Sequence, residues 1–353
     1  MFILRARTLA RYRVLLATGL LLTTGSTVSA VDASPIPLKT STVSAEKSSD
    51  GEVSVTSTTP YLWENVGPTR QRMRDIAMSS TGDLAYAVSD YANGVHGAGR
   101  FYKSTDAGVT WSIVDDIPVG YWRSVTTSAD VSVVAIIGIP AVLPDVPANL
   151  QVLISADGGT TWANPTPGPT EGITTGGHTL KESIDVTADG TTFAVATTAG
   201  PMSYTSNNGW NLLISSSVTK VAIGENNGIV FVHAIDQTGV YTWFTGIGTI
   251  GPKIVLDASG GLQDIDTSDN GQKVIAVSDP NQDNAQTHVS TNAAATWGTA
   301  FDHSAAQFPP NQMHTVAISR DGSRYGVVGY GGTLQESTNN GTTWTASTSG
   351  NHG

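Results

Sequence analysis

The chain contains no cysteine, and this absence excludes several classes of function at once. A disulfide framework, a thiolate nucleophile and a cysteine-ligated metal site all need a sulfhydryl group. Cysteine usage also gives no indication of the redox compartment, because there is no disulfide. With 353 residues, the chain is long enough to bury a full-sized core without cross-links.

Charge is scarce as well, and the charge that is present is mostly negative. Charged residues make up 13% of the chain, and the formal net charge is -11. Nucleic acids and anionic membrane surfaces bind basic patches, so we predict neither partner. The seven histidines are scattered without metal-ligand spacing, and residues 278–287 lack the pattern of a calcium-binding loop. We therefore predict no metal and no cofactor.

Glycine, serine and threonine are abundant instead. The chain has 38 glycines and 39% hydrophobic residues, a balance that is typical of an all-β globular protein with many turns.

The N-terminus has the pattern of a signal peptide. Four arginines between Arg5 and Arg13 precede an apolar run over residues 14–22, and small residues follow up to Ala30. We predict a signal peptide over residues 1–30, cleaved after Ala30, and therefore secretion. The apolar run is short for a retained membrane anchor, and an organelle transit peptide, with a lumenal destination, is the alternative. Losing the four arginines would take the net charge from -11 to -15.

Residues 31–59 are rich in Ser and Thr and show no sustained apolar period. We expect a flexible linker there, followed by one folded domain over residues 60–353.

One eight-residue unit recurs four times along this domain. It reads STDAGVTW at residues 104–111, SADGGTTW at 155–162, STNAAATW at 290–297 and STNNGTTW at 337–344. An Asp or Asn at the third position can accept nearby backbone N–H groups, and Gly supplies a positive φ, so each unit predicts a tight hairpin. The final Trp then buries a large apolar surface.

These units resemble the Asp box, S-x-D-x-G-x-T-W, of sialidases, xyloglucan-cleaving glycosidases, sortilin-type receptors and photosystem assembly factors. The resemblance implies a β-propeller. We expect a structural role for the residues at the marked positions of the units, which are Ser104, Asp106, Gly108, Trp111, Ser155, Asp157, Gly159, Trp162, Ser290, Asn292, Trp297, Ser337, Asn339, Gly341 and Trp344.

A second repeat consists of paired short strands joined by a polar turn. It occurs six times, at 37- to 59-residue intervals, with turns that start at Ser79, Ser128, Thr187, Gly224, Ser268 and Ser319. Repeats of this size with four strands each are typical of propeller blades. We predict six four-stranded blades near residues 73–118, 123–168, 181–217, 218–259, 262–304 and 313–350. A seventh, abbreviated blade is the alternative if the two termini form one together.

The predicted fold has two unlike faces. The loops between blades and between second and third strands emerge on one face, which we call the mouth face. The eight-residue units join third to fourth strands and belong to the opposite face, the turn face. Propellers usually bind ligands at the mouth, so we expect function on the face that the units do not mark.

One aligned column of polar residues stands directly before the six inner strands, at Arg74, Arg123, Glu182, Thr219, Gln263 and His314. As a ring at the mouth, it could hold a sugar or a carboxylate, with Arg offering bidentate contacts. A polar lining of any water-filled mouth explains the column equally well. The predicted ligand-binding residues are Arg74, Arg100, Arg123, Tyr121, Trp122 and His314.

The sequence does not single out catalytic residues, because no pair of acids stands out. Arg74, Arg100 and Arg123 could supply the arginine trio of a sialidase, but the Arg-Ile-Pro motif of that family is missing, so we do not expect true sialidase activity. A glycoside hydrolase would need two facing carboxyl groups, and a polysaccharide lyase a base beside an arginine. The candidates for these roles are Asp75, Asp90, Glu182, Asp264, Tyr91 and His178.

Together these features predict a secreted, monomeric propeller that engages a glycan or polysaccharide at the mouth face, as a binding module or a glycan-active enzyme. The alternative is a non-enzymatic interaction or assembly-factor propeller that docks a protein partner through Arg70, Arg72 and Arg74.

Overall fold

A computed structural model describes most of the region that we expected to fold. The described residues are 43–47, 53–57, 71–92, 95–96, 99–140, 151–164, 180–245, 249–256, 261–278, 285–303, 313–329 and 334–346. The predicted signal peptide with its cleavage site, as well as Arg70 and His178, lies outside them. No helix among the described residues is long and apolar enough to cross a membrane.

The chain divides into two units. In the smaller one, β1 (Val43–Lys47) pairs antiparallel with β2 (Val53–Ser57), within the segment that we expected to be a linker. The larger unit contains all the other strands.

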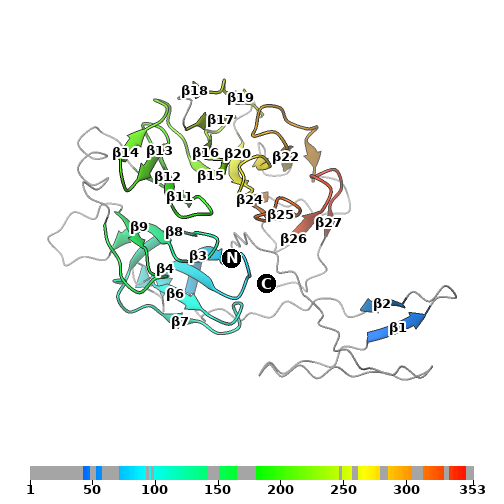
Figure 1. The fold of residues 1–353 in the computed structure, drawn as a ribbon, viewed down its shortest axis with the longest axis horizontal. Helices are drawn as coiled ribbons and strands as arrows, with labels where there is room; N and C mark the ends of the chain where they lie inside the picture. Colours follow the sequence, from blue (N-terminus) through cyan, green and yellow to red (C-terminus); the bar gives the residue numbers. More distant parts are fainter. Residues whose placement is uncertain are drawn as a thin grey trace. The chain divides into compact units, whose positions relative to one another are not determined.

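Six antiparallel sheets make up the larger unit, as predicted, and follow one another along the chain (Figure 1). The first three sheets contain β3 (Gln71–Met78), β4 (Ala85–Ala92), β5 (Val95–His96), β6 (Phe101–Ser104) and β7 (Ser112–Ile113); β8 (Gly120–Thr127), β9 (Val134–Pro140) and β10 (Gln151–Ser155); and β11 (Leu180–Val186), β12 (Thr192–Thr197), β13 (Met202–Thr205) and β14 (Gly209–Leu212).

The last three sheets contain β15 (Lys220–Asn226), β16 (Ile229–Ile235), β17 (Gly239–Phe244), β18 (Thr249–Ile250) and β19 (Ile254–Val255); β20 (Leu262–Thr267), β21 (Val274–Ser278), β22 (Gln286–Ser290) and β23 (Phe301–Asp302); and β24 (Met313–Ile318), β25 (Tyr325–Gly329), β26 (Leu334–Ser337) and β27 (Thr345–Ala346). The sheets are the blades of a six-bladed β-propeller, and their first strands pack side by side from β3 to β24.

Each inner strand is a sheet edge, and at β8, β15 and β24 side chains of the preceding blade accept from its buried N–H groups. Asp75 Oδ2 accepts from Val125 N at 3.1 Å, and Asp264 Oδ2 accepts from Val316 N at 3.2 Å. Asp185 lies two residues nearer the turn of its own blade, and it accepts in the same way from a backbone N–H of the next inner strand. An unpaired buried N–H is costly, so these aspartates hold neighbouring blades together.

The eight-residue units form tight turns after the third strand of their blades, and we call them the repeat turns. In the first, Ser104 Oγ donates to Asp106 Oδ1 at 2.8 Å, and Gly108 N donates to Ser104 Oγ at 2.9 Å. The indole Nε1 of Trp111 donates to the carbonyl of Gly108 at 2.9 Å. The turn is therefore closed at both ends by its own side chains.

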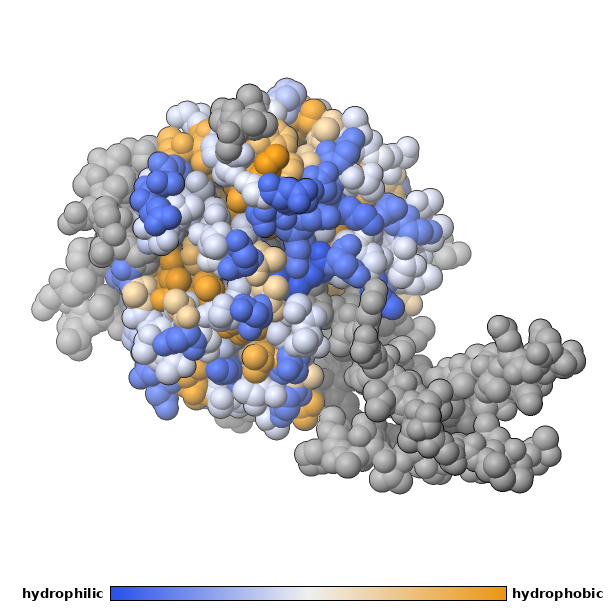
Figure 2. Space-filling model, in the orientation of Figure 1, coloured by the Kyte–Doolittle hydropathy of each residue, from blue (hydrophilic) through white to orange (hydrophobic). Residues whose placement is uncertain are grey.

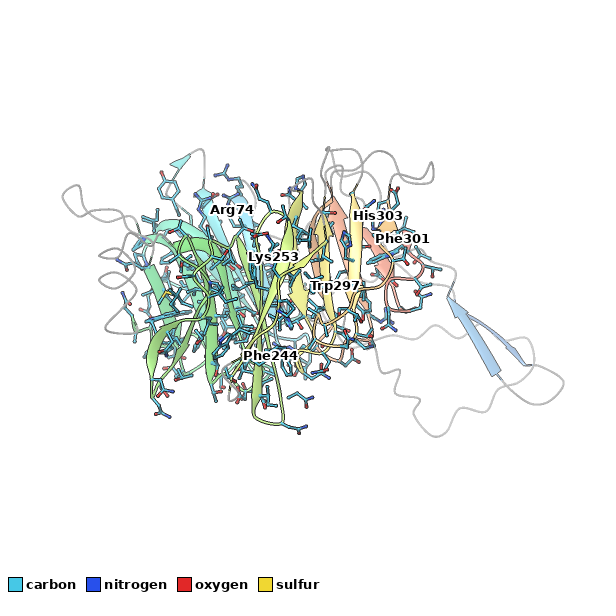
Figure 3. The ribbon with its side chains drawn as sticks, turned by 90° about the horizontal axis from the view of Figure 1, so that it is seen from above. Arg74, Phe244, Lys253, Trp297, Phe301 and His303 are labelled. Atoms are coloured by element: carbon cyan, nitrogen blue, oxygen red, sulfur yellow. The ribbon has the colours of Figure 1, made fainter. Side chains whose placement is uncertain are left out.

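The repeat turns lie beside the turns between first and second strands. Ala107 N donates to Asp83 O at 2.9 Å, and Gly158 N donates to Ser132 O at 3.0 Å. This adjacency fixes the two faces as we expected: Phe244 lies toward the turn face in Figure 3, and Arg74 toward the mouth face. Figure 2 shows hydrophilic residues gathered in a band near the middle of one face.

One arginine connects blades that are far apart in the sequence. Arg320, in the turn between β24 and β25, pairs with Asp269 of the fifth blade at 3.1 Å. Its Nη2 also donates to the carbonyl oxygens of Met78 in the first blade and of Thr127 and Ser128 in the second. The guanidinium of Arg320 thus links the sixth blade to the first, the second and the fifth. Arg320 is 8% exposed.

Candidate functional site

The predicted polar column coincides with irregularities in the inner strands. The pairing of first and second strands shifts register at five of the six blades, at the positions of Arg74, Arg123, Glu182, Gln263 and His314. Such a bulge inserts a residue into one strand and redirects its side chain, and bulges are common next to functional sites.

The fourth blade is the exception. There Thr219 comes directly before β15, and both its N–H and its Oγ1 donate to the carbonyl of Ile235.

Three arginines converge on one carboxylate at the first two blades. Asp90, whose side chain is 0% exposed, accepts from Arg72 Nε at 2.6 Å on Oδ1 and from Arg72 Nη2 at 2.7 Å on Oδ2. Arg74 Nε lies 2.8 Å from Oδ2, and Arg123 Nη1 lies 2.9 Å from the same oxygen. We call Arg72, Arg74, Arg123 and Asp90 the arginine cluster.

The backbone explains why these groups meet. Arg72 and Arg74 are two residues apart in β3, so they point to the same side of the strand. Arg74 is skipped by the pairing of β3 between Met73 and Asp75, and Asp90 of β4 is skipped between the partners of Arg72 and Met73. Arg123 comes from the bulge of β8, the inner strand that packs against β3.

The exposed fractions of the cluster side chains rise outward. They are 19% for Arg123, 29% for Arg74 and 45% for Arg72. The ring of Tyr121, which is partly exposed, lies 6.0 Å from the guanidinium carbon of Arg123. Within the arginine cluster the guanidinium groups are therefore more exposed than the carboxylate, with an aromatic ring close by.

Several predicted site residues have a different place from the one we expected. Trp122 is fully buried in the core between the first two blades, where its Nε1 donates to Pro118 O at 2.9 Å, so it offers no stacking surface at the mouth. Asp75 and Asp264 are buried and bind the next blade, as described above. They hold the fold together rather than face a substrate.

The three arginines at Asp90 differ in one member from the trio that the sequence allowed. The structure brings together Arg72, Arg74 and Arg123, and the trio considered from the sequence had Arg100 in place of Arg72. The backbone N–H of Arg100 donates to Ser89 Oγ. His314 is partly buried at the bulge of β24, Tyr91 lies in β4 and Glu182 lies in β11.

A second polar cluster, in the fourth blade, was not predicted. Lys253 Nζ lies 2.5 Å from Asp236 Oδ2, and Tyr241 donates to the same oxygen at 3.0 Å. Burial raises the pKa of Asp236, but hydrogen bonds from Lys253 and from two backbone N–H groups outweigh it and bring the pKa to about 2. The charges of Lys253 and Asp236 neutralise each other. We therefore assign this cluster a structural role, which is to hold the loop after β16.

No group of three or more His, Asp or Glu side chains in the described part of the chain is arranged to hold a metal ion.

The sequence matches no family model and no curated protein. Solved propellers do share its fold. The structure of YCF48 bound to D1 peptide is 15% identical, with a TM-score of 0.53 over 82% of this chain and 88% of that chain. YCF48 from Cyanidioschyzon merolae gives the same identity and TM-score over 81% and 88%.

A GH74 xyloglucanase from Xanthomonas campestris is also similar. It is 16% identical, with a TM-score of 0.55 over 75% of this chain and 44% of that chain. The chain shares their β-propeller fold. At these identities the likeness extends to the fold alone.

Proposed function

We propose that this protein is a non-enzymatic binding propeller that docks an acidic segment of a partner protein at the mouth face. The observation that carries the proposal is the convergence of Arg72, Arg74 and Arg123 at Asp90. Guanidinium groups present planar forks that match carboxylates, and Asp90 already makes that contact from inside the protein.

The positions of the acids favour binding over hydrolysis. A glycosidase needs two carboxyl groups that face each other across the scissile bond. Asp75 and Asp264 are instead bonded to neighbouring inner strands, and three guanidinium groups surround Asp90. These three acids are thus engaged in structural contacts.

The net charge of the protein favours a local mode of recognition. At -11, the net charge of the chain repels anions, and salt screens long-range attraction beyond a Debye length of about 8–10 Å, so an acidic partner must gain its affinity from short-range contacts. The arginine cluster and the neighbouring Tyr121 offer such contacts. Among propellers of this fold, YCF48 has been solved with a bound peptide, which is consistent with a protein partner.

The repeat turns and the N-terminal pattern complete the proposal. We assign the protein to the Asp-box propellers on its four eight-residue units, and we propose that it acts after secretion. On this basis its partner is an extracellular protein or, with a transit peptide, a lumenal one.

The test is a binding screen with the full chain. An array of Asp- and Glu-containing peptides is compared with the same peptides carrying Asn and Gln, and a panel of uronic-acid oligosaccharides is screened in parallel. We expect acidic peptides to bind, their amide counterparts to lose binding, and affinity to fall at least tenfold in Arg123→Gln. Arg324→Gln, an exposed arginine of the turn face, is the matched control and should bind like the wild type.

Two outcomes would contradict this function. Binding of uronic-acid oligosaccharides without any acidic peptide would support the glycan hypothesis instead. Peptide binding that survives Arg123→Gln would place the docking surface elsewhere.

A further inference from the structure

We infer that the ring of blades opens at one place, the seam between the sixth and the first blade, and that Arg320 is the latch that holds this seam from the turn face. A seam is the layer of side chains between two neighbouring blades. The inference goes beyond the proposed function, because it concerns a motion of the ring and needs no ligand.

The first observation is the exposure of the sixth blade on the side that faces the first. Ala317 of β24 and Gly326 and Val328 of β25 are partly exposed there. Counted from the turns and the strand pairing, each has an equivalent in the other five blades, and these are at most 3% exposed for Ala317 and 0% exposed for Gly326. The equivalents of Val328 are also 0% exposed, and they are Val88, Ile137, Ala196, Ile235 and Val277.

The second observation is that the facing side of the first blade is exposed as well. Ile76 and Met78 of β3 are partly exposed, whereas the equivalents of Met78 in the other blades are at most 3% exposed. The equivalents of Ile76 are at most 2% exposed, and they are Val125, Ile184, Val221, Ile265 and Val316. Of the six seams in the described part of the chain, this is therefore the one that water enters at these positions from both sides.

The third observation is the composition of the apolar clusters. Five of the six clusters among the described residues combine side chains of two neighbouring blades. The sixth cluster contains side chains of the first blade alone, which are Met73, Ile76, Ala87, Tyr102 and Trp111. The inner strands agree with this difference: neighbouring ones pack together from β3 to β24, but within the described ranges no comparable packing joins β24 back to β3.

Arg320 spans the same seam on the turn face. Its Nη2 donates to the carbonyl of Met78, at the turn end of β3, at 3.3 Å, and its own backbone carbonyl accepts from Asp269 N of the fifth blade at 2.9 Å. These contacts hold the turn-face ends of the two blades together. Val328 lies at the other end of its strand, so we expect the seam to part from the mouth side.

The energetic reason for opening here is the apolar surface involved. Parting a dry seam exposes buried apolar side chains to water, and this exposure is unfavourable in proportion to its area. At the seam between the sixth and the first blade, part of that area is already exposed, so local opening costs least there. The arginine cluster belongs to the first two blades, so it stays intact when this seam opens.

The experiment makes use of the absence of cysteine from the chain. A single introduced cysteine reacts with a thiol reagent only when its position becomes accessible. Ala87→Cys places it on the first blade, facing the seam, and Ala276→Cys places it at the equivalent position of the fifth blade, in the seam to the fourth. Both alanines are buried, at 2% and 0% exposed, so they form a matched pair.

We expect Ala87→Cys to be labelled at least about tenfold faster than Ala276→Cys in the folded, full chain, because tenfold corresponds to a small difference between local and global opening. Amide hydrogen exchange of Ala87 and Ala276 in the unsubstituted chain gives the same comparison without any cysteine. Equal rates at the two positions in both measurements would overturn the inference.

The latch is tested by adding Arg320→Met to each cysteine variant. Global destabilisation accelerates both labelling reactions alike, whereas loss of a latch should raise the ratio of the two rates at least about tenfold further. Arg324→Met is the matched control and should leave the ratio unchanged. If Arg320→Met does not fold, Arg320→Lys, which keeps the charge but loses the planar fork, replaces it. An unchanged ratio would show that Arg320 does not hold the seam.

Discussion

Gly108 and Gly341 occupy the same position in two repeat turns, with φ of +85° and +75°. An L-residue in this region costs about 1–2 kcal/mol. Around Gly108 an added Cβ would meet only Trp111 at 3.7 Å, but at Gly341 it would lie 2.7 Å from Val289 Cγ2.

We therefore expect Gly108→Ala to lower the free energy of unfolding by about 1 kcal/mol, from backbone strain alone. Gly341→Ala should cost about 2–4 kcal/mol, since crowding in a packed core adds about 1–3 kcal/mol. Urea denaturation of both variants measures the difference, and equal losses would show that the crowding at Val289 is relieved at no cost.

His233 gives the stability of the protein a pH dependence. It is 0% exposed, and burial lowers its pKa from 6.5 to about 4, against the opposing hydrogen bond to the carbonyl of Gly271. Because the folded-state pKa lies below the unfolded one, the titration of His233 adds almost no pH dependence to the stability above pH 6.5. As the pH falls from there toward 4, the unfolded state takes up the proton first and stability is lost.

The slope of this loss is about 1.4 kcal/mol per pH unit, which amounts to about 2 kcal/mol between pH 6.5 and pH 5. The variant His233→Gln is expected to be less stable at pH 7 but to lose less on acidification to pH 5. Unfolding free energies at several pH values in this interval test the point. Parallel curves for wild type and variant would exclude His233 as a source of the dependence.

At the scale of the element, the repeat turns are alike in sequence but unequal in hydrogen bonding. Trp344 Nε1 donates to Gly341 O at 3.0 Å, as the corresponding tryptophans do in the first two turns. Trp297 Nε1 is buried without a hydrogen-bond partner in the described part of the chain. Ala294 replaces the glycine of this turn and keeps a positive φ of 61°.

Replacing each tryptophan by phenylalanine removes the same ring area but not the same hydrogen bond. We expect Trp344→Phe to be more destabilising than Trp297→Phe by about 1 kcal/mol or more, the value of a typical intramolecular hydrogen bond. Chemical denaturation of the pair measures this difference. A larger loss for Trp297→Phe would mean that its indole N–H is satisfied in solution.

For the whole molecule, the contacts of Arg320 link four blades. Arg320→Met keeps much of the side-chain volume but removes the ion pair to Asp269 and the hydrogen bonds to three carbonyl groups. Breaking a fully buried pair costs about 3–5 kcal/mol, and because Asp269 is 30% exposed we expect a loss at the lower end of that range, about 3 kcal/mol, in the free energy of unfolding.

Arg324→Met is the control, because this arginine of the same turn is exposed and such substitutions usually stay within about 0.5 kcal/mol. The two variants are compared by urea denaturation. Similar small losses would show that the ring is closed without help from Arg320.

The sequence was sufficient to predict the six blades, since their turns recur at intervals of one blade's length and each blade buries the same kind of apolar strand. It also placed Arg74 and Arg123 in the polar column. The bulges turn the side chains of this column toward one another. The bulges themselves could not be predicted. Without them, alternation along β8 does not reveal that Trp122 faces the core while Arg123 faces Asp90.

The acids of the first and second strands were the other difficulty. Asp75, Asp90 and Asp264 are alike in sequence, each a polar residue at the mouth end of a strand. Only the neighbouring blade distinguishes them: an inner-strand N–H beside Asp75 and Asp264, and an arginine of β8 beside Asp90. Such partners are about 30 to 50 residues away in the chain, beyond the reach of a local pattern.

The Arg320 contact has a consequence for the order of synthesis. Arg320 and Met78 are 242 residues apart, so the two partners are never present together until the last blade has been translated. Blades made earlier can fold and stack on one another, since each packs mainly on the next. Until then the growing chain is an open arc with its first blade uncovered on one side, and this interval is when the nascent protein is most exposed to aggregation and to chaperones.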